Sequence, residues 1–143
     1  MAWLSDWAKR TKGTLDSAGA KVSADLTHFA VPVKISDSCG INGHDMSRVF
    51  DEVGSSYLKI AITKADGTTQ LYGEVEKWDA TAEEALIWVS KSDWTISSSA
   101  DEEVYIYYDS GQSDNTAYIG TPGNRTEVWN SDFKGVYLLS GQY

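Results

Sequence analysis

Apolar and polar residues alternate along much of the chain with a period of two, which is typical of half-buried β-strands. From residue 57 to 64 the alternation places Leu58, Ile60 and Ile62 on one face. The turn sequence Ala65-Asp66-Gly67-Thr68 follows, and its glycine can adopt the positive φ that such turns need. We therefore expect the next strand to return as the second arm of an antiparallel hairpin. The predicted strands are residues 29–35, 57–64, 69–78, 86–90 and 104–108.

Pro32 lies in the first of these strands, on the face opposite Phe29, Val31, Val33 and Ile35. Proline has no N–H to donate to a neighbouring strand, so it is confined to sheet edges and bulges. We therefore expect this strand at an edge or interrupted by a bulge.

Helical patterns are short. From Asp45 to Val53 the apolar residues recur at helical spacing, Asp45 can cap the start, and Gly54 can end the helix. A second helical turn is predicted from Thr81 to Ala85, with Thr81 as its cap and Glu84 at the capping-box position.

These elements predict an all-β fold, an antiparallel β-sandwich that is jelly-roll-like in broad terms and carries one or two short helices. A β-barrel is the main alternative. The 143 residues are the length of one domain, which we expect to span 1–143. Within it, residues 1–25 form an N-terminal arm, and residues 128–143 form a C-terminal strand or tail.

The charge balance limits the partners. The chain has 12 basic and 21 acidic residues, for a net charge of −9, and the basic residues are scattered. Nucleic acid and anionic lipid require clustered Lys and Arg, so neither is an expected partner. No run of 18 apolar residues occurs, and the N-terminus lacks the apolar run of a signal peptide. We therefore expect no membrane insertion, and synthesis in a host cytoplasm.

Metal sites and cofactors have little support in the sequence. Cys39 is the single cysteine, and His28 and His44 are the only histidines, so a disulfide framework or a zinc site is not expected. Oxygen ligands for calcium occur after the last predicted strand, at Asp109, Asp114 and Asn115. The spacing is not that of an EF-hand, and a turn in which these side chains bond their own backbone is the favoured interpretation.

Catalysis is weakly indicated. Glu74 and Glu76 share one face of a predicted strand, with Cα atoms roughly 7 Å apart, and paired carboxylates carry out glycoside hydrolysis. Acidic pairs at this spacing are also common on exposed strand faces. A glycoside hydrolase is therefore only a distant alternative, and neither histidine lies in a nucleophile-elbow sequence.

Aromatic residues make up 12% of the chain, including six tryptophans. Exposed rings stack on sugar faces and also anchor protein interfaces. Trp88 lies within an apolar strand and is expected in the core. Trp78 and Trp94 are better candidates for a surface role, although packing in the core is the favoured interpretation of each single ring. Trp3 and Trp7 either hold the N-terminal segment on the sandwich or insert into a neighbouring subunit. The candidates for glycan or interface contacts are Trp3, Trp7, Trp78, Trp94 and Trp129.

Several blocks of the sequence resemble the DUF2341 domains of bacterial, archaeal and phage surface proteins. The blocks are Trp7-x-x-Arg10 and residues 22–35, 45–54, 59–72, 74–79, 87–89, 104–109, 114–118 and 128–137. They cover almost the whole chain. The resemblance implies a β-rich surface module, and it supplies no catalytic residues because the family has no assigned function.

The resemblance also sets the functional expectation. Relatives often precede a concanavalin A-like lectin/glucanase domain, whose first strand begins near the segment similar to residues 128–139. With the chain ending at Tyr143, we expect that neighbouring domain to be absent.

We expect a non-enzymatic structural module on the surface of a phage virion, as a capsid decoration or a tail or fibre component. Its partners would be other virion proteins and further copies of itself. The alternative is a lectin-like carbohydrate-binding module for host-surface glycans.

Overall fold

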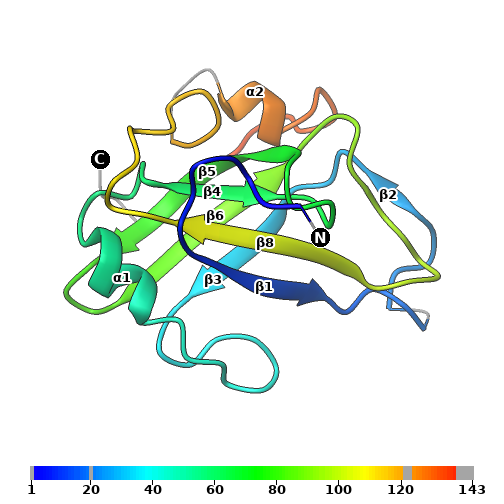
Figure 1. Ribbon diagram of the computed structural model, residues 1–143. Helices are drawn as coiled ribbons and strands as arrows, with labels where there is room; N and C mark the ends of the chain where they lie inside the picture. Colours follow the sequence, from blue (N-terminus) through cyan, green and yellow to red (C-terminus); the bar gives the residue numbers. More distant parts are fainter. Residues whose placement is uncertain (1, 20, 121–123, 138–143) are drawn as a thin grey trace.

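A computed structural model describes residues 2–19, 21–120 and 124–137, and within these ranges the chain forms eight strands and two short helices (Figure 1). The elements in chain order are β1 (Arg10–Leu15), β2 (Leu26–Thr27), β3 (Val31–Ile35), α1 (Arg48–Val53), β4 (Ile60–Thr63), β5 (Gln70–Asp79), β6 (Glu84–Ser90), β7 (Thr95–Ile96), β8 (Glu102–Tyr108) and α2 (Arg125–Val128).

Six strands form one antiparallel sheet in the order β1-β8-β4-β5-β6-β3, and β2 pairs with β7 separately. The ten-residue strand β5 joins the two halves of the large sheet. Gln70 and Leu71 at its start pair with β4, residues 72–79 pair with β6, and its register shifts between Val75 and Lys77. Such a bulge bends a strand and increases its twist.

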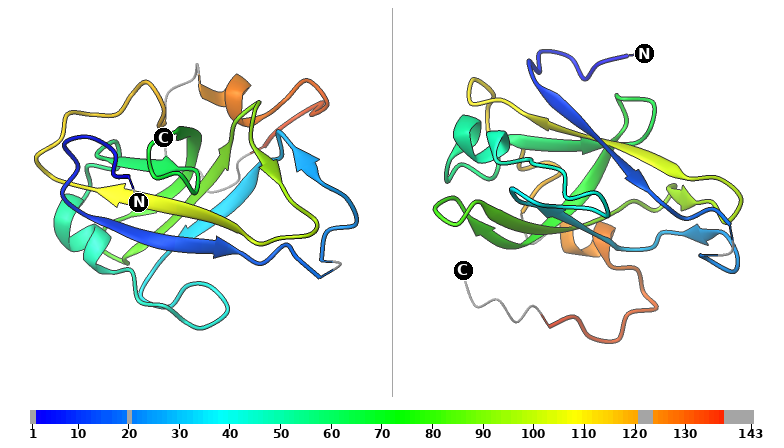
Figure 2. Two further views of the ribbon diagram at one scale, coloured as in Figure 1. Left: turned by 45° about the vertical axis from the view of Figure 1, so that its right-hand side comes forward. Right: turned by 90° about the horizontal axis from the view of Figure 1, so that it is seen from below.

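The sheet consequently folds over on itself as a sandwich. Seen from below in Figure 2, β1, β8 and β4 form one layer, and β5, β6 and β3 form the other. The edge strands β1 and β3 are not paired with each other, so the fold is an all-β sandwich, as the alternation predicted, and not the barrel alternative.

The main core fills the space between the layers. It contains alternate residues of the strands, among them Ile62, Leu71 and Ile87, which are fully buried. Helix α1 closes one end of this core with Val49, Phe50 and Val53, the side chains whose spacing predicted the helix.

Further predictions about single elements are confirmed. The hairpin of β4 and β5 forms, and Gly67 in its turn has φ of 75°. Strand β3 is an edge strand, and Pro32 lies there opposite Trp88. Helix α1 ends at Gly54, which has φ of 54°; it begins later than predicted.

The later start of α1 has a local cause. Asp45 Oδ1 accepts a hydrogen bond from the N–H of Ser47 at 2.9 Å. This short-range bond forms a turn before the helix instead of a cap on it.

Strand β4 differs from the half-buried strand predicted at residues 57–64. It starts only at Ile60, because the backbone turns at Lys59, whose N–H donates to Ser56 O at 2.9 Å. Ala61 and Thr63 on its other face are also fully buried. The N-terminal segment covers that face, since Leu4 and Trp7 pack against the cluster of Ala61, Tyr105 and Tyr107.

The N-terminal arm, residues 1–25, contains the edge strand β1, which pairs with β8 along its whole length. The prediction of a helical turn from Thr81 to Ala85 is wrong. Asp79 Oδ1 accepts the N–H groups of Thr81 and Ala82, and Glu83 takes φ of 53°, so these residues make the tight turn between β5 and β6.

The C-terminal segment forms no strand in the part of 128–143 that the structure describes. Val128 ends α2, and residues 129–137 continue without regular structure. The rest of that prediction, residues 138–143, lies outside the described residues.

Candidate functional site

Helix α2 and the segment after it lie on the outer face of β5 and β6 (Figures 1 and 2). Val128 is fully buried against this face. His28 joins the segment from the side: its ring Nε2 lies 2.8 Å from Glu127 O, and its carbonyl accepts a bond from Asn130 Nδ2 at 3.3 Å. The C-terminal segment is thereby attached to the sandwich at the C-terminal end of α2.

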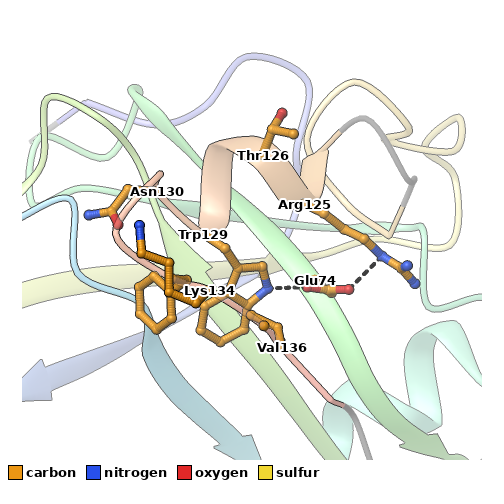
Figure 3. A pocket seen from close by; sticks show the side chains of 9 residues that line it. Glu74, Arg125, Thr126, Trp129, Asn130, Lys134 and Val136 are labelled. Carbon is orange, nitrogen blue, oxygen red and sulfur yellow. Dashed lines mark hydrogen bonds and ion pairs between the residues drawn. The ribbon is translucent and has the colours of Figure 1, made fainter.

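Glu74 lies beneath this segment and is only 6% exposed. It points outward from β5, where the period-two pattern places it. Its Oε1 lies 2.6 Å from Arg125 Nε, and its Oε2 accepts a hydrogen bond from Trp129 Nε1 (Figure 3). A buried carboxylate requires such partners, because an unpaired buried charge costs several kcal/mol.

Three aromatic rings extend outward from this carboxylate. Trp88 on β6 lies 5.2 Å from Trp129, measured between ring centroids, and Trp129 lies 5.0 Å from Phe133 in an edge-on arrangement. Trp88 Nε1 donates to Glu76 Oε2 at 2.5 Å. Phe133 is the outermost ring and is 40% exposed.

A hollow of about 400 Å³ opens beside these rings, and we call it the α2 hollow. It is lined by Glu74, Arg125, Thr126, Trp129, Asn130, Phe133, Lys134, Gly135 and Val136. A neighbouring hollow of about 420 Å³, the β2 hollow, is lined by Asp25, Leu26, Thr27, His28, Phe29, Asn130, Asp132 and Phe133. Because Asn130 and Phe133 line both, the two hollows are adjacent, with Phe133 between them.

The acidic pair of the sequence is held in place by indole groups. Glu74 and Glu76 each accept a bond from an indole N–H, and Glu74 also pairs with Arg125. The site therefore places an ion pair beside aromatic rings, an arrangement suited to holding a polar ligand with apolar faces.

Two tryptophans do not lie where their candidate roles would place them. Trp94 is 4% exposed and belongs to the main core, so it is wrong as a candidate for surface contacts, and the core packing favoured for a single ring applies to it. A turn brings its ring inward, because its N–H donates to Lys91 O and its carbonyl accepts from His28 N. Trp88, predicted in the core, lies half-buried on the outer face and is covered by Trp129.

Trp78, near the end of β5, is partly buried against α1. Its Nε1 donates to Gly54 O at 2.9 Å, and its ring lies 5.0 Å from that of Phe50. The structure thus uses this ring to fasten the end of α1 to the sheet.

Trp3 and Trp7 lie on the outer face of the other layer, 5.9 and 6.1 Å from the ring of Tyr107. Arg10 is stacked between Trp3 and Tyr105, with its guanidinium carbon 4.1 and 4.2 Å from the two ring centroids. Of the two predicted arrangements, the chain adopts the one in which these rings hold the N-terminal segment on its own sandwich.

The calcium candidates do not converge. Asp109 accepts the N–H groups of Gly111 and Ala8, at 2.8 and 2.9 Å. Asn115 Nδ2 donates to Ile60 O and to Gln70 Oε1, and Asp114 is exposed. Within residues 2–19, 21–120 and 124–137, no group of three or more His, Cys, Asp or Glu residues is placed to hold a metal ion.

Of the residues in the α2 hollow, the sequence had pointed only to Glu74 and Trp129. Arg125, Asn130, Phe133 and Lys134 follow no motif of known chemistry. The signal that could have found them is indirect: after the glycines at 120 and 123, aromatic residues recur every four positions, at Trp129, Phe133 and Tyr137.

No helix in the described part of the chain is long and apolar enough to cross a membrane.

Comparison with known proteins gives a family and no individual relative. Neither a curated protein nor a solved structure matches the chain. The family model for a domain of unknown function, DUF2341, matches residues 56–137, which is more than half of the chain and includes β4 to β8, α2 and the lining of the α2 hollow. The chain therefore belongs to the DUF2341 family, as the resemblance of its sequence blocks had indicated.

Proposed function

We propose that this protein is a non-enzymatic structural module of a phage virion, in a capsid decoration or in a tail or fibre, and that it acts through protein–protein contacts. Its partners are other virion proteins and further copies of itself. The virion surface as its location rests on the resemblance to phage surface proteins.

One observation carries the proposal of protein contacts. Every residue from 131 to 137 is exposed, and these seven positions include Phe133, Val136 and Tyr137, the last with 86% of its surface exposed. Large apolar side chains that cluster on a surface mark interaction sites, and aromatic residues contribute most to the binding energy of such sites. We call residues 131–137 the exposed segment.

The net charge of −9 supports the same class of partner. It keeps a protein with exposed aromatic rings soluble before assembly. It also disfavours nucleic acid, whose binding requires clustered positive charge.

The test is whether the protein occurs at a fixed ratio to the major structural protein in particles purified from a host that carries its gene. The proposal predicts a constant ratio across preparations, and predicts that Tyr137→Ser lowers it. As a matched control, Tyr57→Ser changes a tyrosine that is also exposed but lies outside the exposed segment. Particles that lack the protein altogether would overturn the proposal.

A second candidate function, carbohydrate binding, is favoured by a different observation. The α2 hollow combines the rings of Trp129 and Phe133 with a carboxylate, a guanidinium and an amide. Saccharides are bound by this combination, because their C–H faces stack on aromatic rings and their hydroxyls need both donors and acceptors.

A further inference from the structure

We infer that the α2 hollow and the β2 hollow together form one groove for a neutral polysaccharide, with consecutive sugar units on the two sides of Phe133. The inference rests on the second candidate function, and it names the site and the chemical class of the ligand. It does not depend on the virion proposal.

The aromatic wall is positioned in advance. Trp129 cannot rotate freely, because its N–H is bound to Glu74 and its ring packs between Trp88 and Phe133. Phe133 borders both hollows and keeps 40% of its surface exposed. A sugar ring in either hollow can therefore contact an aromatic ring that loses little conformational freedom on binding.

The polar groups match hydroxyls, which both donate and accept hydrogen bonds. Glu74 and Arg125 place an acceptor and a donor side by side (Figure 3). Arg125 uses its Nε for this pair, and 53% of the surface of its side chain is exposed. Asn130, shared by both hollows, adds an amide that has one bond from Asp132 N and one to His28 O. An amide can form further bonds at each end.

The charges favour a neutral ligand over an anionic one. The groove is lined by two cations, Arg125 and Lys134, and by three carboxylates, Glu74, Asp25 and Asp132. This excess of negative charge lies on a chain whose net charge is −9. An anionic polymer would be repelled both by the groove and by the whole molecule.

Two adjacent hollows also indicate a chain of sugars and not a single one. The β2 hollow has its own polar groups, Thr27 and His28, and its own exposed ring, Phe29. A second unit on the far side of Phe133 would find hydrogen-bonding groups there as well. A disaccharide is therefore expected to bind more tightly than its monosaccharide.

The test titrates the isotope-labelled protein with short neutral oligosaccharides built from glucose, galactose, mannose or xylose, and with oligogalacturonate as the anionic probe. The readout is the NMR signal of the Trp129 indole N–H, which lies in the site. We expect a neutral oligosaccharide to shift this signal, and we expect added salt not to weaken the binding. Salt would weaken binding that relied on charge.

Phe133→Ala tests the position of the groove. We expect it to weaken binding about tenfold, since one aromatic contact is lost, whereas Phe133→Trp keeps a ring and should retain the affinity. Tyr57→Ala is the control, because Tyr57 is exposed but lines neither hollow. Unchanged binding in Phe133→Ala would overturn the site.

The outcomes separate the inference from the function on which it rests. Salt-sensitive binding of oligogalacturonate alone would overturn the neutral class but leave carbohydrate binding in place. No shift with any of the saccharides would overturn both.

Discussion

Tyr107 connects segments that are far apart in the sequence through a single buried hydroxyl. The oxygen accepts the N–H of Leu4 at 3.1 Å and an N–H of Arg10 at 2.8 Å, and the hydroxyl donates to Gly67 O at 2.7 Å. The side chain is fully buried. The N-terminal segment, β1 and the β4–β5 turn therefore share one polar contact point.

Removing that hydroxyl is expected to destabilise the protein. Tyr107→Phe leaves the N–H of Leu4 and the carbonyl of Gly67 without this partner, at a cost of about 1–3 kcal/mol. Urea unfolding measures the loss, and Tyr57→Phe, which alters a partly exposed tyrosine, should cost far less. Equal effects of the two substitutions would contradict a special role for the Tyr107 hydroxyl.

Glu52 gives the fold a defined sensitivity to acid. Bonds from Lys9 and from the hydroxyl and N–H of Ser110 lower the pKa of this carboxyl from 4.5 to about 2. A depressed pKa means that the folded state favours the charged form, so this stabilisation is present above pH 4.5 and is lost as the pH falls towards 2.

The matching experiment compares the wild type with Glu52→Gln in unfolding titrations across this pH range. The wild type is expected to be the more stable near neutral pH, and the difference is expected to disappear as the pH approaches about 2. A difference that does not change with pH would show that the carboxylate charge has no part in the effect.

At the scale of elements, each layer of the sandwich has its outer face covered by a chain end. The N-terminal segment lies over β8 and β4, and α2 with the following residues lies over β5 and β6 (Figure 2). The second cover depends on Glu74, which joins β5 to Arg125 and Trp129. The exposed segment and the α2 hollow exist only while this cover is in place.

Trp129→Phe tests that dependence, since it retains a ring and removes the N–H that bonds to Glu74. A hydrogen bond to a charged group contributes about 1.5–3 kcal/mol, so α2 is expected to open more easily. Hydrogen exchange at the backbone N–H of residue 129, which bonds to Arg125 O, should then be more than about tenfold faster. Trp78→Phe removes a different indole bond, the one that Trp78 near the end of β5 donates to Gly54 O, and should leave this exchange rate unchanged.

At the scale of the whole molecule, net charge and exposed apolar surface act against each other. The charge of −9 makes copies of the protein repel one another, whereas the exposed segment favours contact between them. Dissolved salt screens the repulsion but leaves the apolar attraction in place.

Self-association is therefore expected to increase with ionic strength. Sedimentation velocity at low and high salt measures it, and Tyr137→Ser should reduce the assembly seen at high salt. Loss of assembly with rising salt would instead indicate contacts between opposite charges, and would count against the exposed segment as the contact surface.

Local patterns were sufficient for most of the sheet. Period-two alternation predicted β3, β4, β5, β6 and β8, because a strand in a sandwich must turn alternate side chains inward wherever it lies in the fold. Glycines 54 and 67 marked the end of α1 and the hairpin turn, and Pro32 marked an edge strand, since these effects belong to the residue itself.

Strand β1 had no such pattern. Its sequence, Arg-Thr-Lys-Gly-Thr-Leu, is polar, and pairing with β8 makes it a strand. The alternation of β6 likewise placed Trp88 on one face without showing that Trp129 would cover it from a distant part of the chain.

The sequence by itself determined the class of fold, the main strands, the excess of acidic charge and the membership of a family. Only the tertiary structure decided that Trp94 is buried, that Glu74 is paired with Arg125, and that Phe133 stands between two hollows. The physical reason is that a strand pattern depends on neighbouring residues, whereas burial and pairing on an outer face depend on which distant segment packs there.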